Sequence, residues 1–174
     1  MDVVFPTRDA WMTAYRERWL THYQTTGAID WKLYPSLKLD AALASVAIDV
    51  TQSNLLLITS AGGYIPSVHD AFDAANDLGD YSIRLVDTQY PPSAYHFAHD
   101  HYDHTAVDAD PQVLVPVHHL LEMQDAGAIG ELAPQVVSFM GYQPDLGRVV
   151  DEMIPEIVQV AHDLRVDAAF LVPS

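Results

Sequence analysis

Three short apolar runs constrain the fold of this chain more strongly than any other feature of its sequence. They span residues 54–59, 135–140 and 167–172, and glycines follow the first two at Gly62 and Gly141. A run of about six apolar residues is short for a buried helix, and one that stops at glycine is typical of a strand buried in a parallel sheet. We therefore predict three core strands at these positions.

Segments with a helical repeat of apolar residues precede and separate these strands. We predict helices over residues 7–25, 40–51, 116–126 and 145–164. The last has the longest apolar stripe, and Pro155 within it predicts a kink. Residues 82–87 alternate between polar and apolar side chains and indicate one further short strand.

The order of these elements predicts an α/β fold with a mainly parallel sheet flanked by helices, in three layers of the flavodoxin-like or Rossmann-like kind. We expect a single domain over residues 1–174, with an N-terminal helical segment of about 7–51 and a core of about 54–174. In open sheets of this kind, ligands bind beyond the carboxyl ends of the strands. The segments that follow the three core strands should therefore meet at one edge.

Composition excludes several classes of function. The 174 residues include 24 acidic and 8 basic side chains, and the net charge of −16 argues against binding nucleic acid or an anionic membrane. There is no cysteine, so these residues hold no disulfide, thiolate metal site or cysteine nucleophile. The first residues lack a signal-peptide pattern and no run of about 18 apolar residues occurs, so we expect a cytoplasmic protein.

Four of the nine histidines lie within residues 95–104. From His99 to His104 the pattern is H-x-H-x-D-H, which resembles the first zinc motif of metallo-β-lactamase-like hydrolases. Imidazoles and a carboxylate could hold a zinc ion that lowers the pKa of a bound water to about 7. Such hydrolases need more ligands on later strands than this chain offers. A zinc hydrolase or metal-binding module is an alternative interpretation, beside a polar loop whose side chains bond one another.

A second resemblance covers more of the chain. In order, the sequence contains TSAG at 59–62, FD at 72–73, HDHYD at 99–103, GAIG at 127–130, SFMGY at 138–142 and LVP at 171–173. Together these segments resemble the selenoprotein B subunit family of the glycine, sarcosine, betaine and D-proline reductases. The resemblance extends from about residue 54 to residue 174, and HDHYD and SFMGY are its most specific strings.

The resemblance implies an oxidoreductase that reductively cleaves a C–N bond beside the carboxylate of an amino-acid-like substrate. In that family a selenocysteine or cysteine attacks, because its ionised form is abundant and nucleophilic near neutral pH, and a thiol system restores it. The family's position for this residue falls immediately after Ser174. We expect the 174 residues alone to be inactive. Either the gene continues past a UGA codon for selenocysteine, or the chain is a naturally short, non-redox binding subunit.

The resemblance and the strand-end argument together predict the site residues. We expect His99, His101 and Asp103 to act in catalysis by transferring a proton to the leaving amine. We expect the substrate to be bound by Ser60, Ala61, Gly62, Asp100, Tyr102, Ser138, Gly141 and Tyr142. Backbone N–H groups at 60–62 suit a carboxylate, the tyrosines suit a quaternary amine, and Gly141 permits a close backbone approach.

Partners and cofactors follow from the same resemblance. Apart from the selenocysteine or cysteine expected after Ser174, we expect no cofactor, with zinc as the alternative. The expected partners are a small amino-acid-like substrate and other reductase subunits or a second copy of the chain, with neither nucleic acid nor membrane among them.

Overall fold

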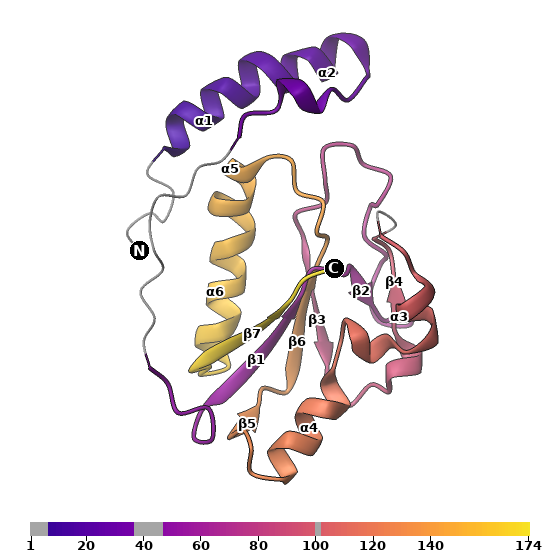
Figure 1. The fold of residues 1–174 in the computed structure, drawn as a ribbon, viewed down its shortest axis with the longest axis vertical. Coiled ribbons are helices and arrows are strands. Elements are labelled where there is room, and N and C mark those ends of the chain that lie inside the picture. Colours follow the sequence, from indigo (N-terminus) through magenta and orange to yellow (C-terminus); the bar gives the residue numbers. More distant parts are fainter. Residues whose placement is uncertain (1–6, 37–46, 100–101) are drawn as a thin grey trace. The chain divides into compact units, whose positions relative to one another are not determined.

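The computed structural model describes residues 7–36, 47–99 and 102–174 (Figure 1). It contains two compact units, which are described in turn: one comprises residues up to 46 together with 145–147, and the other comprises residues 47–144 and 148–174. The expectation of a single domain stays a prediction. Within the described ranges, no helix is both long enough and apolar enough to cross a membrane.

A helix with an aromatic face dominates the described part of the first unit. It runs from α1 (Arg8–Ala14) through a π-helical turn (Tyr15–Leu20) into α2 (Thr21–Thr26), and it ends at Gly27 with φ of 69°. The sequence predicted this helix over 7–25. Trp11, Tyr15 and Trp19 stack in series with ring centroids 5.1 and 5.5 Å apart, and all three rings are buried. The aromatic stripe is therefore a packing face of this small unit.

The second unit is built on a five-stranded sheet centred on β1. Its strands are β1 (Asn54–Thr59), β3 (Ile83–Asp87), β5 (Glu131–Leu132), β6 (Gln135–Phe139) and β7 (Ala168–Val172). β7 pairs in parallel with β1 along one edge, while β5 and β6 pair in parallel with its start and its end along the other. β3 is antiparallel to β6, so the sheet is mixed but mostly parallel.

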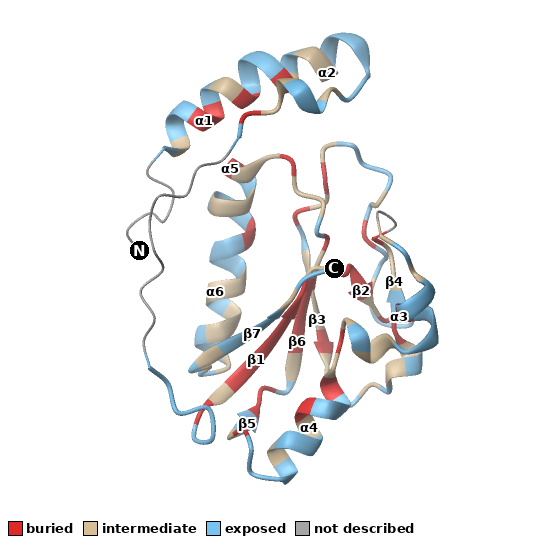
Figure 2. Ribbon diagram, in the orientation of Figure 1, coloured by how far each residue is buried: buried red, intermediate tan, exposed pale blue. Residues whose placement is uncertain are grey.

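Helices cover both faces of this sheet, which confirms the predicted α/β architecture. Leu57 of β1 lies in a core that α4 (Val117–Asp125) covers through Leu120. Leu56, its neighbour on the opposite face, lies in a core that α6 (Ile154–Asp163) covers. The strand is buried on both sides, as its unbroken apolar sequence predicted. Figure 2 shows the burial concentrated in β1 and β6.

The long C-terminal helix accommodates its proline by a change of helix type. α5 (Leu146–Arg148) leads into a π-helical turn (Val149–Met153) and then into α6, in which Pro155 occupies the first turn. Arg148, Met153 and Ile154 all have helical backbone angles, so Pro155 lies inside one continuous helix, directly after a π-helical turn in which the i→i−4 hydrogen-bond pattern is already interrupted. The predicted helix over 145–164 is confirmed.

The predicted helix over 40–51 is wrong for the part that the structure describes. Residues 47–52 form a coil and a turn, and residues 40–46 lie outside the described ranges. The Asp49 carboxylate accepts hydrogen bonds from the Thr51 N–H (3.1 Å) and the Thr51 hydroxyl (2.7 Å). The Ser53 hydroxyl donates to the Asp49 carbonyl at 2.8 Å. These local side-chain bonds stabilise a turn in competition with a helix.

Two small elements absent from the predictions flank the histidine cluster. β2 (Gly63–Tyr64) and β4 (His96–Phe97) form an antiparallel pair, and α3 (Thr105–Ala109) follows soon afterwards. Because β2 leaves the end of β1 directly, this pair carries the segment 96–99 back toward the carboxyl edge of the sheet. The Ala98 N–H fixes the arrangement by donating to the Gly62 carbonyl at 3.0 Å.

Candidate functional site

The carboxyl ends of β1 and β7 are tied together by serines. The Ser60 N–H donates to the Val172 carbonyl at 3.1 Å, which continues the sheet ladder by one residue. Beyond it, the Ser174 N–H donates to Ser60 Oγ at 2.9 Å, and the Ser174 hydroxyl donates to the Ser60 carbonyl at 3.2 Å. The chain at Ser174 is thereby held beside the loop that follows β1.

The carboxyl end of β6 joins the same edge. The Gly62 N–H donates to the Phe139 carbonyl at 2.9 Å, and Ala61 bridges to Met140 in an antiparallel arrangement. Gly62 has φ of 64°, and a Cβ there would lie 2.6 Å from the Met140 sulfur. Only glycine suits this position. The three segments that the strand order brings to one edge do meet there.

All three backbone N–H groups of residues 60–62 donate hydrogen bonds within the protein. The Ser60 and Gly62 N–H groups donate to main-chain carbonyls, and the Ala61 N–H donates to Thr59 Oγ1 at 3.3 Å. The N–H groups that the sequence assigned to a substrate carboxylate therefore already have acceptors within the protein. Ser60 Oγ is the polar side-chain atom that this loop presents at the edge, where it also lies 3.1 Å from Ser174 Oγ.

His99 lies directly against this edge. Its side chain is buried, and a Cβ built at Gly141 would lie 3.0 Å from His99 Nε2 and 3.2 Å from the Ser60 carbonyl oxygen. The imidazole, the loop after β1 and the loop after β6 thus share one small space. Gly141 itself is exposed, so the loop after β6 lies at the protein surface.

A stack of rings connects His99 to His104. The Tyr102 ring contacts the edge of the His99 ring at a centroid distance of 5.3 Å and stacks on the His104 ring at 4.5 Å. His104 Nε2 lies 2.6 Å from the His99 carbonyl oxygen. A carbonyl only accepts, so this nitrogen carries the proton. The Tyr102 hydroxyl is buried with no hydrogen-bond partner among the described residues, and burial together with the Asp108 charge raises its pKa to about 12.

The other predicted residues form hydrogen bonds with partners other than His99, or are buried elsewhere. The Asp103 carboxylate accepts from the Thr105 hydroxyl (2.6 Å) and N–H (2.9 Å), and these bonds lower the pKa of Asp103. The Tyr142 hydroxyl donates to the Asp77 carbonyl at 3.0 Å. The Ser138 side chain is fully buried within β6. Asp100 and His101 lie outside the described residues.

The structure thus brings together one subset of the predicted residues. Ser60, Ala61, Gly62, His99 and Gly141 converge at the carboxyl edge, with Tyr102 against His99. A carboxylate with a lowered pKa, such as Asp103, is a poor proton donor near neutral pH. Within the described ranges, no group of three or more His, Asp or Glu side chains is arranged to hold a metal ion.

Sequence reasoning missed two features near this edge. One is the hydrogen bonding between Ser60 and Ser174: strand order predicted that their segments meet at this edge, but the bonds themselves depend on the direct pairing of β1 with β7. The other is His104 with Asp108, whose i,i+4 spacing at a helix start was a usable signal. The first depends on which strands pair with each other and the second on the position of α3, and the strand pattern specifies neither.

The fold is that of an α/β protein with a mostly parallel sheet, and this polar edge lies at the carboxyl ends of its parallel strands, where ligands generally bind in open sheets of this class. The chain belongs to the family described as glycine/sarcosine/betaine reductase selenoprotein B (GRDB), whose sequence profile matches residues 34–174. Among curated proteins it is similar to the D-proline reductase subunit gamma of Acetoanaerobium sticklandii, at 28% identity over 127 residues. That match covers 72% of this chain and 50% of the relative, so the chain spans about half the length of that protein. No solved structure matches the chain significantly.

Proposed function

We propose that this chain is a subunit of a reductase that cleaves the C–N bond of an amino-acid-like substrate, and that the carboxyl edge of its sheet forms part of the active site. The observation that carries the proposal is the convergence of His99, Gly141 and the Ser60–Ser174 pair. Membership of the selenoprotein B family and the similarity to a D-proline reductase subunit support this class of reaction.

The attacking group has to come from outside the 174 residues, because these contain no cysteine. When present, a selenolate or thiolate would attack the carbon next to the carboxylate and displace the amine with its bonding electron pair, forming a carbon–selenium or carbon–sulfur bond. Two thiols of the reductant would then be oxidised to a disulfide as that bond is cleaved, which leaves a C–H bond on the released acid and restores the selenol or thiol. The family's position for it, directly after Ser174, fits the geometry. The hydrogen bond from the Ser174 N–H to Ser60 Oγ would start the following residue at the same edge as His99 and Gly141.

We assign proton transfer to His99. A departing amine needs a proton, and a histidine is the side chain best suited to give one near neutral pH. The Tyr102 ring against its edge and the hydrogen bond from His104 to its own carbonyl restrict how the segment can move. His101 and Asp103 remain candidates for the same role, with His101 outside the described residues.

Substrate binding is assigned to the walls of this edge. Ser60 contributes its hydroxyl, Gly62 and Gly141 allow their loops to pack closely against Met140 and His99, and Ala61 is buried in the same loop. Asp100, Tyr102, Ser138 and Tyr142 complete the proposed set, although the Tyr142 hydroxyl is engaged by the Asp77 carbonyl and Ser138 is buried. In this arrangement Ser138 and Tyr142 would shape the site through the strand and loop that they support.

The proposed protein does not act alone. The D-proline reductase relative is named as a subunit of its enzyme. We propose that this chain likewise assembles with other reductase subunits, or with a second copy, and that the thiol reductant acts within that assembly.

Purification of the tagged chain from its natural host, followed by an assay of the recovered complex, tests the proposal. We expect dithiothreitol-dependent cleavage of one of four substrates, namely glycine, sarcosine, betaine and D-proline, measured as the amine-containing product. His99→Gln should lower the rate about 100-fold or more. His118→Ala, on the exposed face of α4, is the matched control and should leave the rate unchanged. A complex that contains a reactive selenol or thiol and cleaves none of the four, or full activity of His99→Gln, would contradict the proposal.

A further inference from the structure

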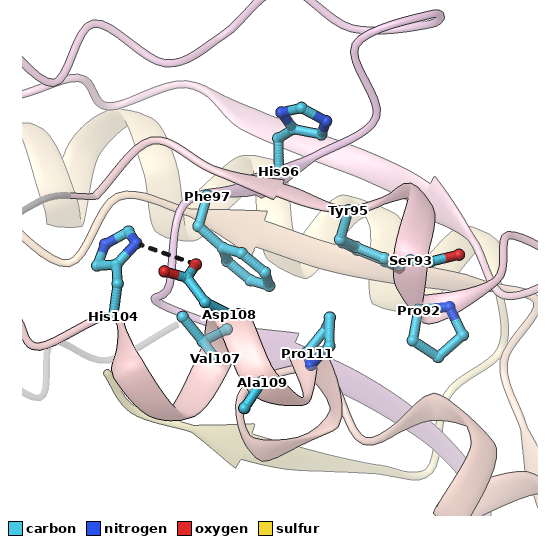
Figure 3. Close-up of a pocket in the computed structure, with 10 residues that line it drawn as sticks. All are labelled: Pro92, Ser93, Tyr95, His96, Phe97, His104, Val107, Asp108, Ala109 and Pro111. Carbon is cyan, nitrogen blue, oxygen red and sulfur yellow. Dashed lines mark ion pairs between the residues drawn. The ribbon is translucent and has the colours of Figure 1, made fainter.

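A second hollow is connected to the candidate site through His104, whose ring lines the hollow and bonds the His99 carbonyl. It is a pocket of about 750 Å³, a size typical of small-molecule sites, between the segment around β4 and the helix α3 (Figure 3). Its lining residues are Pro92, Ser93, Tyr95, His96, Phe97, His104, Val107, Asp108, Ala109 and Pro111.

The floor of this pocket is apolar and rigidly held. Tyr95 and Val107 are buried in the core, at 7% and 1% exposure. Figure 3 shows Phe97 and Val107 facing each other across the hollow from opposite walls. The Pro92 and Pro111 rings add further apolar surface. A ligand that enters this pocket therefore places an apolar stem on the floor and has one aromatic face available for stacking.

One end of the pocket presents two hydrogen-bond acceptors. Because His104 Nε2 donates to the His99 carbonyl, Nδ1 carries the lone pair in the neutral form of the ring, whereas in the protonated form it pairs with Asp108. That nitrogen lies 3.9 Å from Asp108 Oδ1, and stacking on Tyr102 fixes the ring in this orientation. Because His104 Nδ1 and the Asp108 carboxylate face the same space, this end of the pocket favours a ligand with several N–H donors and a positive charge.

The charge of the surrounding chain favours the same ligand. No lysine or arginine occurs between Arg84 and Arg148, whereas this stretch carries nine Asp and Glu residues. Arg84 stacks on Phe72 and Arg148 on Tyr81, so both flanking arginines are engaged elsewhere. A ligand carboxylate would find no lysine or arginine among the lining residues, while a cation would be attracted by the summed negative field.

We propose that this pocket binds a guanidinium-type organic cation on an apolar stem, either as a free molecule or as an arginine side chain of a partner. A guanidinium presents planar N–H donors to the His104 Nδ1 and Asp108 acceptors. Its flat face stacks on an aromatic ring such as Phe97, and its weak hydration lowers the cost of leaving water. Ser93, at the other end in Figure 3, offers a hydroxyl to a second polar group of the ligand.

Titration of the ¹⁵N-labelled full chain with n-butylguanidinium tests this assignment. We expect saturable chemical-shift changes at Ser93, Phe97, His104 and Val107. Pentanoate, an anion with a similar stem, should produce no saturable change. Blocked arginine, N-acetyl-arginine amide, distinguishes the two sources. If blocked arginine binds more tightly than butylguanidinium, the ligand is an arginine side chain of a partner. If it binds more weakly, the ligand is a free molecule. Either result supports a pocket that recognises a guanidinium group.

Two variants and one control make the test decisive. Asp108→Asn should weaken binding at least tenfold and still fold, because the Asp108 side chain is 72% exposed. Ala109→Phe, at an exposed position on the pocket wall, should block the hollow. Asp125→Asn removes the same charge from an exposed position on α4 and should bind like the wild type. No saturable binding of the cation, equal binding of pentanoate, or unchanged binding by Asp108→Asn would overturn the proposal.

Discussion

The backbone N–H of Ser174 donates a hydrogen bond to the hydroxyl oxygen of Ser60 at 2.9 Å, across 114 residues of sequence. Parallel pairing of β1 with β7 brings the two residues to the same end of the sheet. The bond extends the ladder past the last strand residue and determines the direction in which the chain leaves β7. In the proposed function that direction is what brings the redox side chain to His99.

Loss of the Ser60 hydroxyl should loosen the chain at Ser174 and leave the sheet intact. In Ser60→Ala the Ser174 N–H loses its acceptor, at a cost of about 1 kcal/mol for that bond. The ladder bond from the Ser60 N–H to Val172 involves only backbone and persists. We expect exchange of the Ser174 amide proton to become about fivefold faster while that of Leu57 stays unchanged. Ser67→Ala, at an exposed turn, serves as the control. If the Ser174 amide proton exchanges at the same rate in Ser60→Ala as in the wild type, the anchoring role of Ser60 is refuted.

A methyl group at Gly141 should displace His99. The new Cβ would lie 3.0 Å from His99 Nε2, well inside the ordinary contact distance of about 3.5 Å. We expect the His99 ring resonances to shift and reductase activity of the complex to fall about 10- to 100-fold. Gly127→Ala is the matched control. It has φ of 70° with nothing within 4 Å, so it should cost about 1 kcal/mol of stability without a loss of activity. Wild-type activity in Gly141→Ala would show that His99 is not needed in its present position.

β1 and β6 could be predicted because they are buried within the sheet, whereas β7 is equally apolar in sequence although Phe170 and Leu171 are exposed at the sheet edge. Unbroken apolar runs predicted β1, β6 and β7 with boundaries accurate to about one residue. The direction of β3 was not available from the pattern, because this strand alternates in the same way whether it lies parallel or antiparallel to β6. The predicted helix at 47–51 was wrong because the Asp49 side chain stabilises a turn. The helical spacing of apolar residues does not reveal that this turn competes with a helix.

The meeting of three segments at one edge also followed from strand order, since parallel strands end on the same side. What each group does there did not follow. The N–H groups of Ser60 and Gly62 were expected to be free for a ligand, but their acceptors, on β7 and β6, are defined only by tertiary pairing. His104 shows the same limitation. Its bond to the His99 carbonyl depends on the path of the loop between them, which no periodic pattern describes.

Acid should weaken the loop that supports Tyr142. Burial opposes ionisation of Asp80, but hydrogen bonds from the Ser82 hydroxyl and from the Asp73 and Ser82 N–H groups outweigh it and lower the pKa of Asp80. A carboxyl group with a lowered pKa adds stability above its unfolded pKa of about 3.9, and the protein loses that stability as the pH falls through the folded value.

Asp80→Asn should therefore reduce stability at pH 7 by about 1 kcal/mol and make the decline below pH 4 shallower. Urea unfolding at a series of pH values measures both effects. Asp70→Asn is the control in the same loop, because the bond from Arg84 to Asp70 uses the backbone carbonyl and survives the change. A decline with pH as steep in Asp80→Asn as in the wild type would refute the role of this carboxylate.

Removal of the Tyr102 hydroxyl should change stability only in alkali. The pKa of Tyr102 is raised to about 12 by burial and by Asp108, so the folded protein keeps this proton above pH 10 while the unfolded chain loses it. Stability from the neutral phenol is complete below pH 10 and is lost as the pH rises to about 12. At pH 7, Tyr102→Phe removes a buried hydroxyl that has no partner among the described residues, so it should alter stability by less than about 1 kcal/mol. Between pH 10 and 12 the variant should lose stability less steeply than the wild type. Tyr90→Phe provides the control, and ultraviolet titration should show one fewer late-ionising phenol only in Tyr102→Phe.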